Sequence, residues 1–219
     1  MKIISESACE ALLRETAVGR DSAHDLQHVK RVVENARKIG IAEGAELRIL
    51  IPAAWLHDLV VLSKNSADRK QASRISAEKS GEWLRACAVP ENQTEAISHC
   101  IAAHSFSAGI EPRTIEAKVL QDADRLDALG AVGIARCFVT GAGFGSEFYH
   151  PEIPLPAAVS READDSRYIL DHFFTKLFRL PELMQTETAR QMARSRIAFM
   201  ERYIAQFMDE IGSEQTFPT

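Results

Sequence analysis

The chain has little of several features that define whole classes of protein. Its four cysteines are far apart in 219 residues and form no CxxC pair, which argues against a disulfide framework or a zinc knuckle. It has no block of lysine and arginine, and its net charge is −5, so nucleic-acid scaffolding is not expected as its role. No apolar run is long enough to cross a membrane, and the first residues, MKIISESACEALLRE, do not form the apolar core of a signal peptide. These absences predict a cytoplasmic protein without a membrane partner, with small buried thiols at Cys9, Cys87, Cys100 and Cys137.

Alternating strand patterns are also missing, and helical periodicity dominates the chain. Helices are expected over residues 4–16, 24–39, 49–62, 71–87, 91–104, 114–130, 131–140, 165–178 and 181–208. Asp21 or Ser22 is expected to cap the second helix, Gly40 to end it, and Pro52 to lie in the first turn of the third. The prediction is an all-α fold, a single helical bundle over residues 1–219. Its core covers about residues 20–140, and helices over about residues 165–208 pack on it.

Two apolar patterns predict which helical faces are buried. Val29, Val32, Val33 and Ala36 share one face of the second expected helix, and Ala117, Leu120, Leu126 and Leu129 form a similar stripe later. The segment 49–62 is apolar almost all round, which predicts a central position in the core.

The pair His57–Asp58 lies inside that apolar segment, in AAWLHDLVVL. A buried carboxylate costs several kcal/mol unless it is paired or coordinated. Adjacent helical residues are rotated by about 100°, so two such side chains can approach one ion from two directions. His28 and Asp124, on two other helices, would complete a four-ligand set that leaves positions open for water and substrate. The alternative is a hydrogen-bonded His–Asp pair in the core.

The order H…HD…D resembles the HD-domain metal-dependent phosphohydrolase superfamily. The first His lies in DLQHVKRV and the last Asp in DADRLDALGAVGIAR, and the resemblance extends from about residue 20 to about residue 208. More narrowly, it resembles small bacterial HD nucleotide hydrolases, including a nucleoside-triphosphate pyrophosphohydrolase. The resemblance implies an HD-type bundle and metal ligands at His28, His57, Asp58 and Asp124, with Asp122 a competitor for the last place. It also implies one divalent ion (Mn, Mg, Zn, Fe, Co or Ni) and hydrolysis of a nucleotide or related small phosphate by metal-activated water.

Further residues are candidates for catalysis and for contact with the substrate. Asp58, His104 and Asp127 are the expected catalytic residues, although Asp127 is equally well interpreted as a surface carboxylate. Some relatives carry an acid where this chain has Val61, so the general base is open. Lys64, Asn65 and Arg69 follow the metal pair and are expected to bind phosphate, with Arg125 a weaker candidate; the alternative is a solvated loop. The loop 141–145 lacks a Walker ending, so it is a flexible connector or a lid.

Three functions remain open at this point. The first is phosphohydrolysis, with release of pyrophosphate, orthophosphate or a linearised cyclic nucleotide. The second is a catalytically silent HD protein that binds a nucleotide, for which Val61 is the support. The third is an oxygen-using di-iron enzyme, which requires His99 and His104 to hold a second ion. The native metal, the base of the substrate and the oligomeric state do not follow from the sequence.

Overall fold

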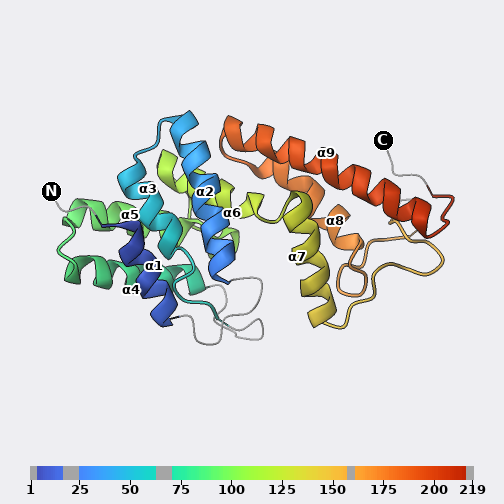
Figure 1. The fold of residues 1–219 in the computed structure, drawn as a ribbon, viewed down its shortest axis with the longest axis horizontal. Coiled ribbons are helices and arrows are strands. Elements are labelled where there is room, and N and C mark those ends of the chain that lie inside the picture. Colours follow the sequence, from blue (N-terminus) through green and yellow to red (C-terminus); the bar gives the residue numbers. More distant parts are fainter. Residues whose placement is uncertain (1–3, 17–24, 63–70, 157–160, 216–219) are drawn as a thin grey trace. The chain divides into compact units, whose positions relative to one another are not determined.

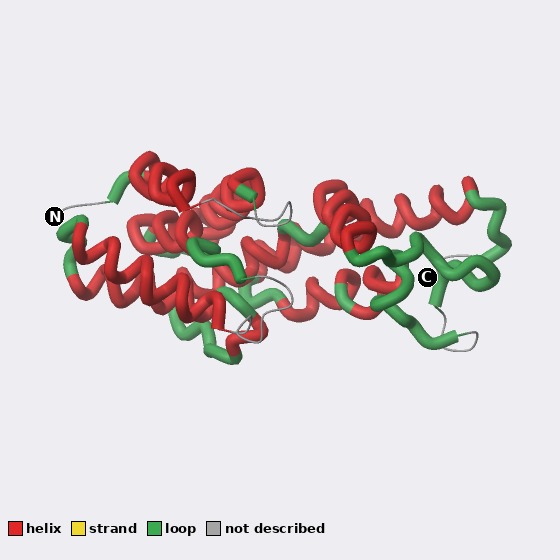
Figure 2. The backbone as a smooth tube through the Cα atoms, turned by 90° about the horizontal axis from the view of Figure 1, so that it is seen from below, coloured by secondary structure: helices red, strands yellow, loops and turns green. Residues whose placement is uncertain are grey.

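The computed structural model describes residues 4–16, 25–62, 71–156 and 161–215, and throughout these ranges the chain consists of helices and loops (Figures 1 and 2). One isolated bridge between Glu147 and Tyr168 is the sole strand-like pairing recorded there. The predicted all-α class is therefore confirmed. The described helices are α1 (Glu6–Thr16), α2 (Leu26–Glu43), α3 (Leu47–Leu56), α4 (Ala72–Ala86), α5 (Glu91–Ala103), η2 (Phe106–Ala108), α6 (Ile115–Leu126), α7 (Gly130–Gly143), α8 (Asp171–Thr175), η3 (Leu177–Leu183) and α9 (Glu187–Glu210).

The chain divides into two compact units, residues 1–124 and 125–219. The first unit contains α1 to α5 and most of α6, and the second contains α7, α8, η3 and α9. The predicted packing of the C-terminal helices on the core stays a prediction. No single described helix is long and apolar enough to span a membrane, and α6 and α7 reach that length and composition only when taken together across the break between them.

Helix α3 is the central element of the first unit. It packs against α1, α2, α4 and α5, and every residue from Leu50 to Leu56 is buried. Both predicted apolar stripes are also buried, with Val29 on α2 and Leu120 on α6 fully enclosed. The four cysteines are free thiols. The prediction that the apolar segment lies centrally is confirmed.

The predicted ends of α2 were wrong. The helix passes through Gly40 and ends at Gly44, whose φ of 71° is the left-handed conformation that glycine adopts without a steric penalty. Gly40 has a packing role instead, because a Cβ there would lie 2.4 Å from the Cδ2 of Leu50 on α3. At the other end Asp25 is the cap, since its side chain accepts a hydrogen bond from the His28 N–H. Asp21 and Ser22 lie outside the described residues.

Helix α3 also differs from its prediction. It begins at Leu47, capped by the Glu46 side chain, so Pro52 lies beyond the first turn, where the helix forgoes one internal hydrogen bond. It ends at Leu56 rather than at residue 62. His57 and Asp58 therefore follow the helix instead of lying within it.

In the second unit the glycines of segment 141–145 are mostly helical. Helix α7 continues through Gly141 and Gly143, and only Gly145 has a positive φ, of 76°. A Cβ on Gly141 would lie 2.4 Å from the Cγ1 of Ile169, so this glycine permits close packing. The prediction of a connector or lid over the whole segment was wrong.

The expected long helix over residues 165–178 is also absent from the described second unit. Two short elements, α8 and η3, replace it, and α9 follows at Glu187 with Thr186 as its cap. The physical reason is Asp171, which is fully buried and accepts hydrogen bonds from the Asp164 N–H and the Arg161 guanidinium. These bonds hold the preceding segment in turns. Helix α9, red in Figure 1, packs against α7 and η3.

Candidate metal centre

Two helices of the first unit end in a histidine, and the two rings are held in the same way. His57 is the C-cap of α3 and His104 is the C-cap of α5. The Nδ1 of His57 lies 2.8 Å from the Ala54 carbonyl, and the Nδ1 of His104 lies 2.7 Å from the Ile101 carbonyl. A carbonyl can only accept, so each Nδ1 donates its hydrogen, and in a neutral ring this leaves the lone pair on Nε2. Both rings are thus prepared to offer Nε2 to a cation or a proton.

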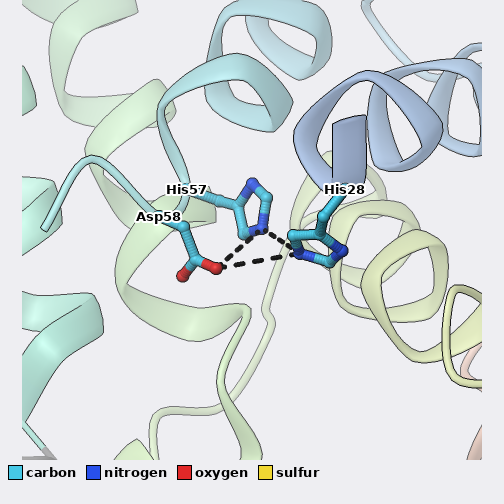
Figure 3. Close-up of side chains that lie close together, drawn as sticks. All are labelled: His28, His57 and Asp58. Atoms are coloured by element: carbon cyan, nitrogen blue, oxygen red, sulfur yellow. Dashed lines mark hydrogen bonds and ion pairs between the residues drawn. The ribbon is translucent and has the colours of Figure 1, made fainter. Parts of the chain in front are cut away.

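Asp58 lies among three imidazole rings. Its Oδ2 is 3.5 Å from the Nε2 of His57 and 3.7 Å from the Nε2 of His28. Figure 3 draws both contacts as dashed lines. Its Oδ1 is 3.6 Å from the Nε2 of His104. The Nε2 atoms of His28 and His57 are 3.4 Å apart. His28, His57 and Asp58 each offer a ligand atom within 4.8 Å of the others.

Asp124 reaches this group from α6 through His28. Its Oδ1 lies 3.5 Å from the Nε2 of His28. The structure therefore brings Asp124, the residue that the ADRL context favoured over Asp122, to the first histidine. Asp122 is fully buried, whereas the Asp124 side chain is 31% exposed. An exposed edge on Asp124 leaves the group open on that side.

These distances fit a single divalent ion. Two ligands of a tetrahedral ion, each about 2.1 Å from it, are separated by roughly 3.4 Å. The three distances among the Nε2 of His28, the Nε2 of His57 and the Oδ2 of Asp58 run from 3.4 to 3.7 Å. Asp124 adds a contact of 3.5 Å to the Nε2 of His28. Two helix C-termini, each with partial negative charge, meet beside the two carboxylates and favour a cation further. Burial lowers the pKa of His104, and the neighbouring His57 acts in the same direction.

The other predicted site residues have different surroundings. Asp127 is 2% exposed and its Oδ2 accepts a hydrogen bond from Arg136 at 2.6 Å, so a surface carboxylate is the wrong interpretation of it. Arg125 donates to the Leu183 carbonyl at 2.5 Å. Lys64, Asn65 and Arg69 lie outside the described residues, and their role as phosphate ligands stays a prediction.

His99 does not join the group around Asp58. Its Nε2 accepts a hydrogen bond from the Arg113 N–H at 3.2 Å, and its ring lines a groove between α4 and α5. In the described ranges, the set of His, Cys, Asp and Glu residues close enough to share an ion is His28, His57 and Asp58. The geometry therefore gives no support to a second ion held by His99 and His104.

Sequence reasoning missed four buried polar side chains that bind the backbone beside the site. Ser76 bonds both the N–H and the carbonyl of Val60, two residues after Asp58. The Asn35 amide donates to the Ala123 carbonyl, next to Asp124. Ser73 and Gln121 donate to the Ala102 and Ala103 carbonyls, just before His104. Helical spacing held a signal for Gln121, because it lies four residues after Ala117 on the buried stripe.

Comparison with known proteins agrees with this geometry. The family model described as "HD domain" matches residues 25–129. The uncharacterized protein YpgQ of Bacillus subtilis (strain 168) is 37% identical over 194 residues, which cover 87% of this chain and 85% of YpgQ.

Solved structures match over most of the chain as well. The crystal structure of Bacillus subtilis YpgQ in complex with ADP is 33% identical, with a TM-score of 0.72 and coverage of 93% of both chains. The crystal structure of an HD-superfamily hydrolase from Bacillus thuringiensis is 34% identical, with a TM-score of 0.73 and coverage of 95% of this chain and 97% of that one. With its H…HD…D residues gathered in one place, the chain belongs to the HD-domain superfamily, as its motifs indicated.

Proposed function

We propose that this protein is a divalent-metal phosphohydrolase that acts on a nucleotide or a related small phosphate. The observation that carries the proposal is the convergence of the Nε2 atoms of His28, His57 and His104 on the carboxylate of Asp58. The membership of the HD superfamily supports it. A structural His–Asp pair would account for one of these contacts but not for three rings around one carboxylate.

In this proposal His28, His57, Asp58 and Asp124 hold the metal. The Nδ1–H bond to Ala54 keeps the His57 lone pair directed at Asp58, as a ligand requires. A divalent ion bound there would lower the pKa of a coordinated water toward neutrality and polarise a phosphoryl oxygen. The exposed edge of Asp124 leaves room for a substrate phosphate.

His104 is the proposed contact with the substrate or with the transferred proton. Its Nε2 lies beside Oδ1 of Asp58, whereas His28 and His57 lie beside Oδ2. It therefore lies beside the metal ligands, at the other oxygen of Asp58. The ion pair of Asp127 with Arg136 favours a structural role for Asp127 over proton transfer.

The proposed substrate is a nucleotide because the similar protein YpgQ was crystallised with ADP. Pyrophosphate release from a nucleoside triphosphate is the first candidate reaction, and cleavage of a phosphomonoester or phosphodiester is the second. Lys64, Asn65 and Arg69 remain the predicted phosphate contacts.

A screen of nucleotides against Mn²⁺, Mg²⁺, Zn²⁺, Co²⁺, Ni²⁺ and Fe²⁺, with the phosphorus products identified, tests the proposal. We expect metal-dependent release of pyrophosphate or orthophosphate that is lost in Asp58→Ala and kept in Asp209→Ala, an exposed control on α9. Circular dichroism would confirm that both variants are folded. The absence of any phosphorus product would refute the proposal, and it would favour a silent nucleotide-binding protein if nucleotide binding persisted.

A further inference from the structure

The C-terminal end of α5 is held by side chains from two other helices. A helix end leaves its last four carbonyls without partners inside the helix. In α5 the Ile101 carbonyl accepts from the His104 ring at 2.7 Å, and the Ala102 carbonyl accepts from the Ser73 hydroxyl of α4 at 3.1 Å. The Ala103 carbonyl accepts from the Gln121 amide of α6 at 3.0 Å. The last three carbonyls of α5 thus each accept a hydrogen bond from a different side chain.

The backbone contact that His104 makes at this end is long. The His104 N–H lies 3.5 Å from the Ile101 carbonyl, at the limit of a hydrogen bond. The bond from Gln121 is shorter and buried, and it acts on the peptide that immediately precedes His104. Since the direction of a side chain follows from the backbone that carries it, the Gln121 bond constrains where the His104 ring lies.

Gln121 also lies one turn before Asp124 on α6, and residues three apart share a helical face. The same helix therefore carries a predicted metal ligand and holds the residue before His104. Helix α6 therefore links His104 to Asp124 by contacts that do not involve Asp58.

We propose that Gln121 is a positioning residue that orients His104 toward the metal centre, with Ser73 acting on the preceding carbonyl in the same way. The inference rests on the proposed function for its catalytic meaning. Its structural content, a fixed His104 ring, stands apart from catalysis and can be measured separately.

The first test reads the His104 ring directly in the metal-free full chain. Nitrogen NMR shifts of the imidazole distinguish the Nδ1–H tautomer from the Nε2–H tautomer. We expect the Nδ1–H form in the wild type and a mixture of forms, or exchange broadening, in Gln121→Met, which keeps the length and burial of the side chain but removes the donor. Gln191→Met, at an exposed site on α9, is the matched control and should match the wild type.

The second test is a double-mutant cycle on the nucleotide and metal that the activity screen identifies. We expect Gln121→Met to lower kcat about tenfold, in the range that small misplacements of catalytic groups produce. The Kd for the metal alone should stay within about twofold, because His104 lies outside the ligand set. In a His104→Ala background, Gln121→Met should have no further effect on kcat, since the group that it positions is gone.

Several outcomes overturn the inference. These are an unchanged His104 tautomer in Gln121→Met, an equal loss of kcat in both backgrounds, or full activity of His104→Ala. If the wild type hydrolyses no nucleotide, the proposed function fails, and the NMR result still decides whether Gln121 fixes the ring. Should Gln121→Met not fold, Ser73→Ala removes the neighbouring cap and is judged by the same two measurements.

Discussion

Replacing Asp58 by asparagine tests the metal centre most directly. The substitution keeps the shape of the side chain and removes the negative charge that lies 3.5 Å from His57 and 3.7 Å from His28. The metal-free protein should change little in stability, because an amide of the same size remains in a partly exposed position. The increase in stability that the wild type gains from bound metal should be largely lost in this variant.

The magnitude follows from the coupling of binding to unfolding. A ligand at about a hundred times its Kd stabilises the folded state by about 2.7 kcal/mol. For a chain of this size each kcal/mol moves Tm by about 2–4 °C, so the wild type should gain roughly 5–11 °C. Removing a residue that hydrogen-bonds to a metal ligand weakens metal binding by about 10–100-fold. Removing the carboxylate ligand of Asp58 itself should therefore weaken metal binding by at least about 100-fold. At the same metal concentration the variant should gain only about 0.4 kcal/mol, or roughly 1–2 °C.

The assay is thermal unfolding followed by circular dichroism, first with a chelator and then with Mn²⁺ at a hundred times the wild-type Kd from calorimetry. Asp209→Asn, on the exposed face of α9, is the control and should show the wild-type shift. An equal rise in Tm for the wild type and Asp58→Asn would show that Asp58 does not hold the metal. The assignment of the four ligands would then have to be abandoned.

Three further predictions concern the rest of the molecule. Asp171→Ala should lower the free energy of unfolding in urea by about 3–5 kcal/mol, because it removes the carboxylate that pairs with the largely buried Arg161. A loss no larger than that of Glu187→Ala, which breaks an exposed ion pair, would contradict this. Burial and then Arg113 lower the pKa of His99, so the stability that its neutral form contributes should be complete above about pH 6.5 and fall as the pH drops below that value. Urea midpoints at about pH 7.5 and 5.5 should therefore differ more in the wild type than in His99→Gln. Burial raises the thiol pKa of Cys9, Cys100 and Cys137 to about 12. These thiols should therefore react with a disulfide reagent far more slowly in the native protein than in urea. Rapid labelling of all four native thiols would be inconsistent with the fold.

Local patterns predicted the main helices of both units, α7 and α9 of the second unit included, but not the short elements α8 and η3. Apolar spacing correctly marked Val29 and Leu120 as buried, because helical periodicity and burial are both local properties of a helix face. Glycine was misinterpreted at Gly40 and Gly141, where it serves close packing with Leu50 and Ile169 rather than ending a helix. Such contacts come from residues distant in sequence, so no window around the glycine contains them.

The same limit explains the missing helix over residues 165–178. The helical spacing is present there, but the buried Asp171 takes its hydrogen bonds from Arg161 and the Asp164 backbone, which favour turns. A polar residue with partners seven and ten residues away overrides a weak local preference for helix.

The sequence by itself determined the helical class and the identity of the metal-binding candidates. A carboxylate at Asp58 inside an apolar segment requires compensation wherever the chain folds, and the resemblance of the H…HD…D order to the HD superfamily named His28 and Asp124 as further candidate ligands. Only the tertiary structure decided that His57 and His104 both end helices, that their Nδ1 atoms are occupied by backbone carbonyls, and that Gln121 caps the carbonyl before His104. These features depend on where separate helices end relative to one another. Packing of the whole unit sets that relation, which the periodicity of any single helix leaves open.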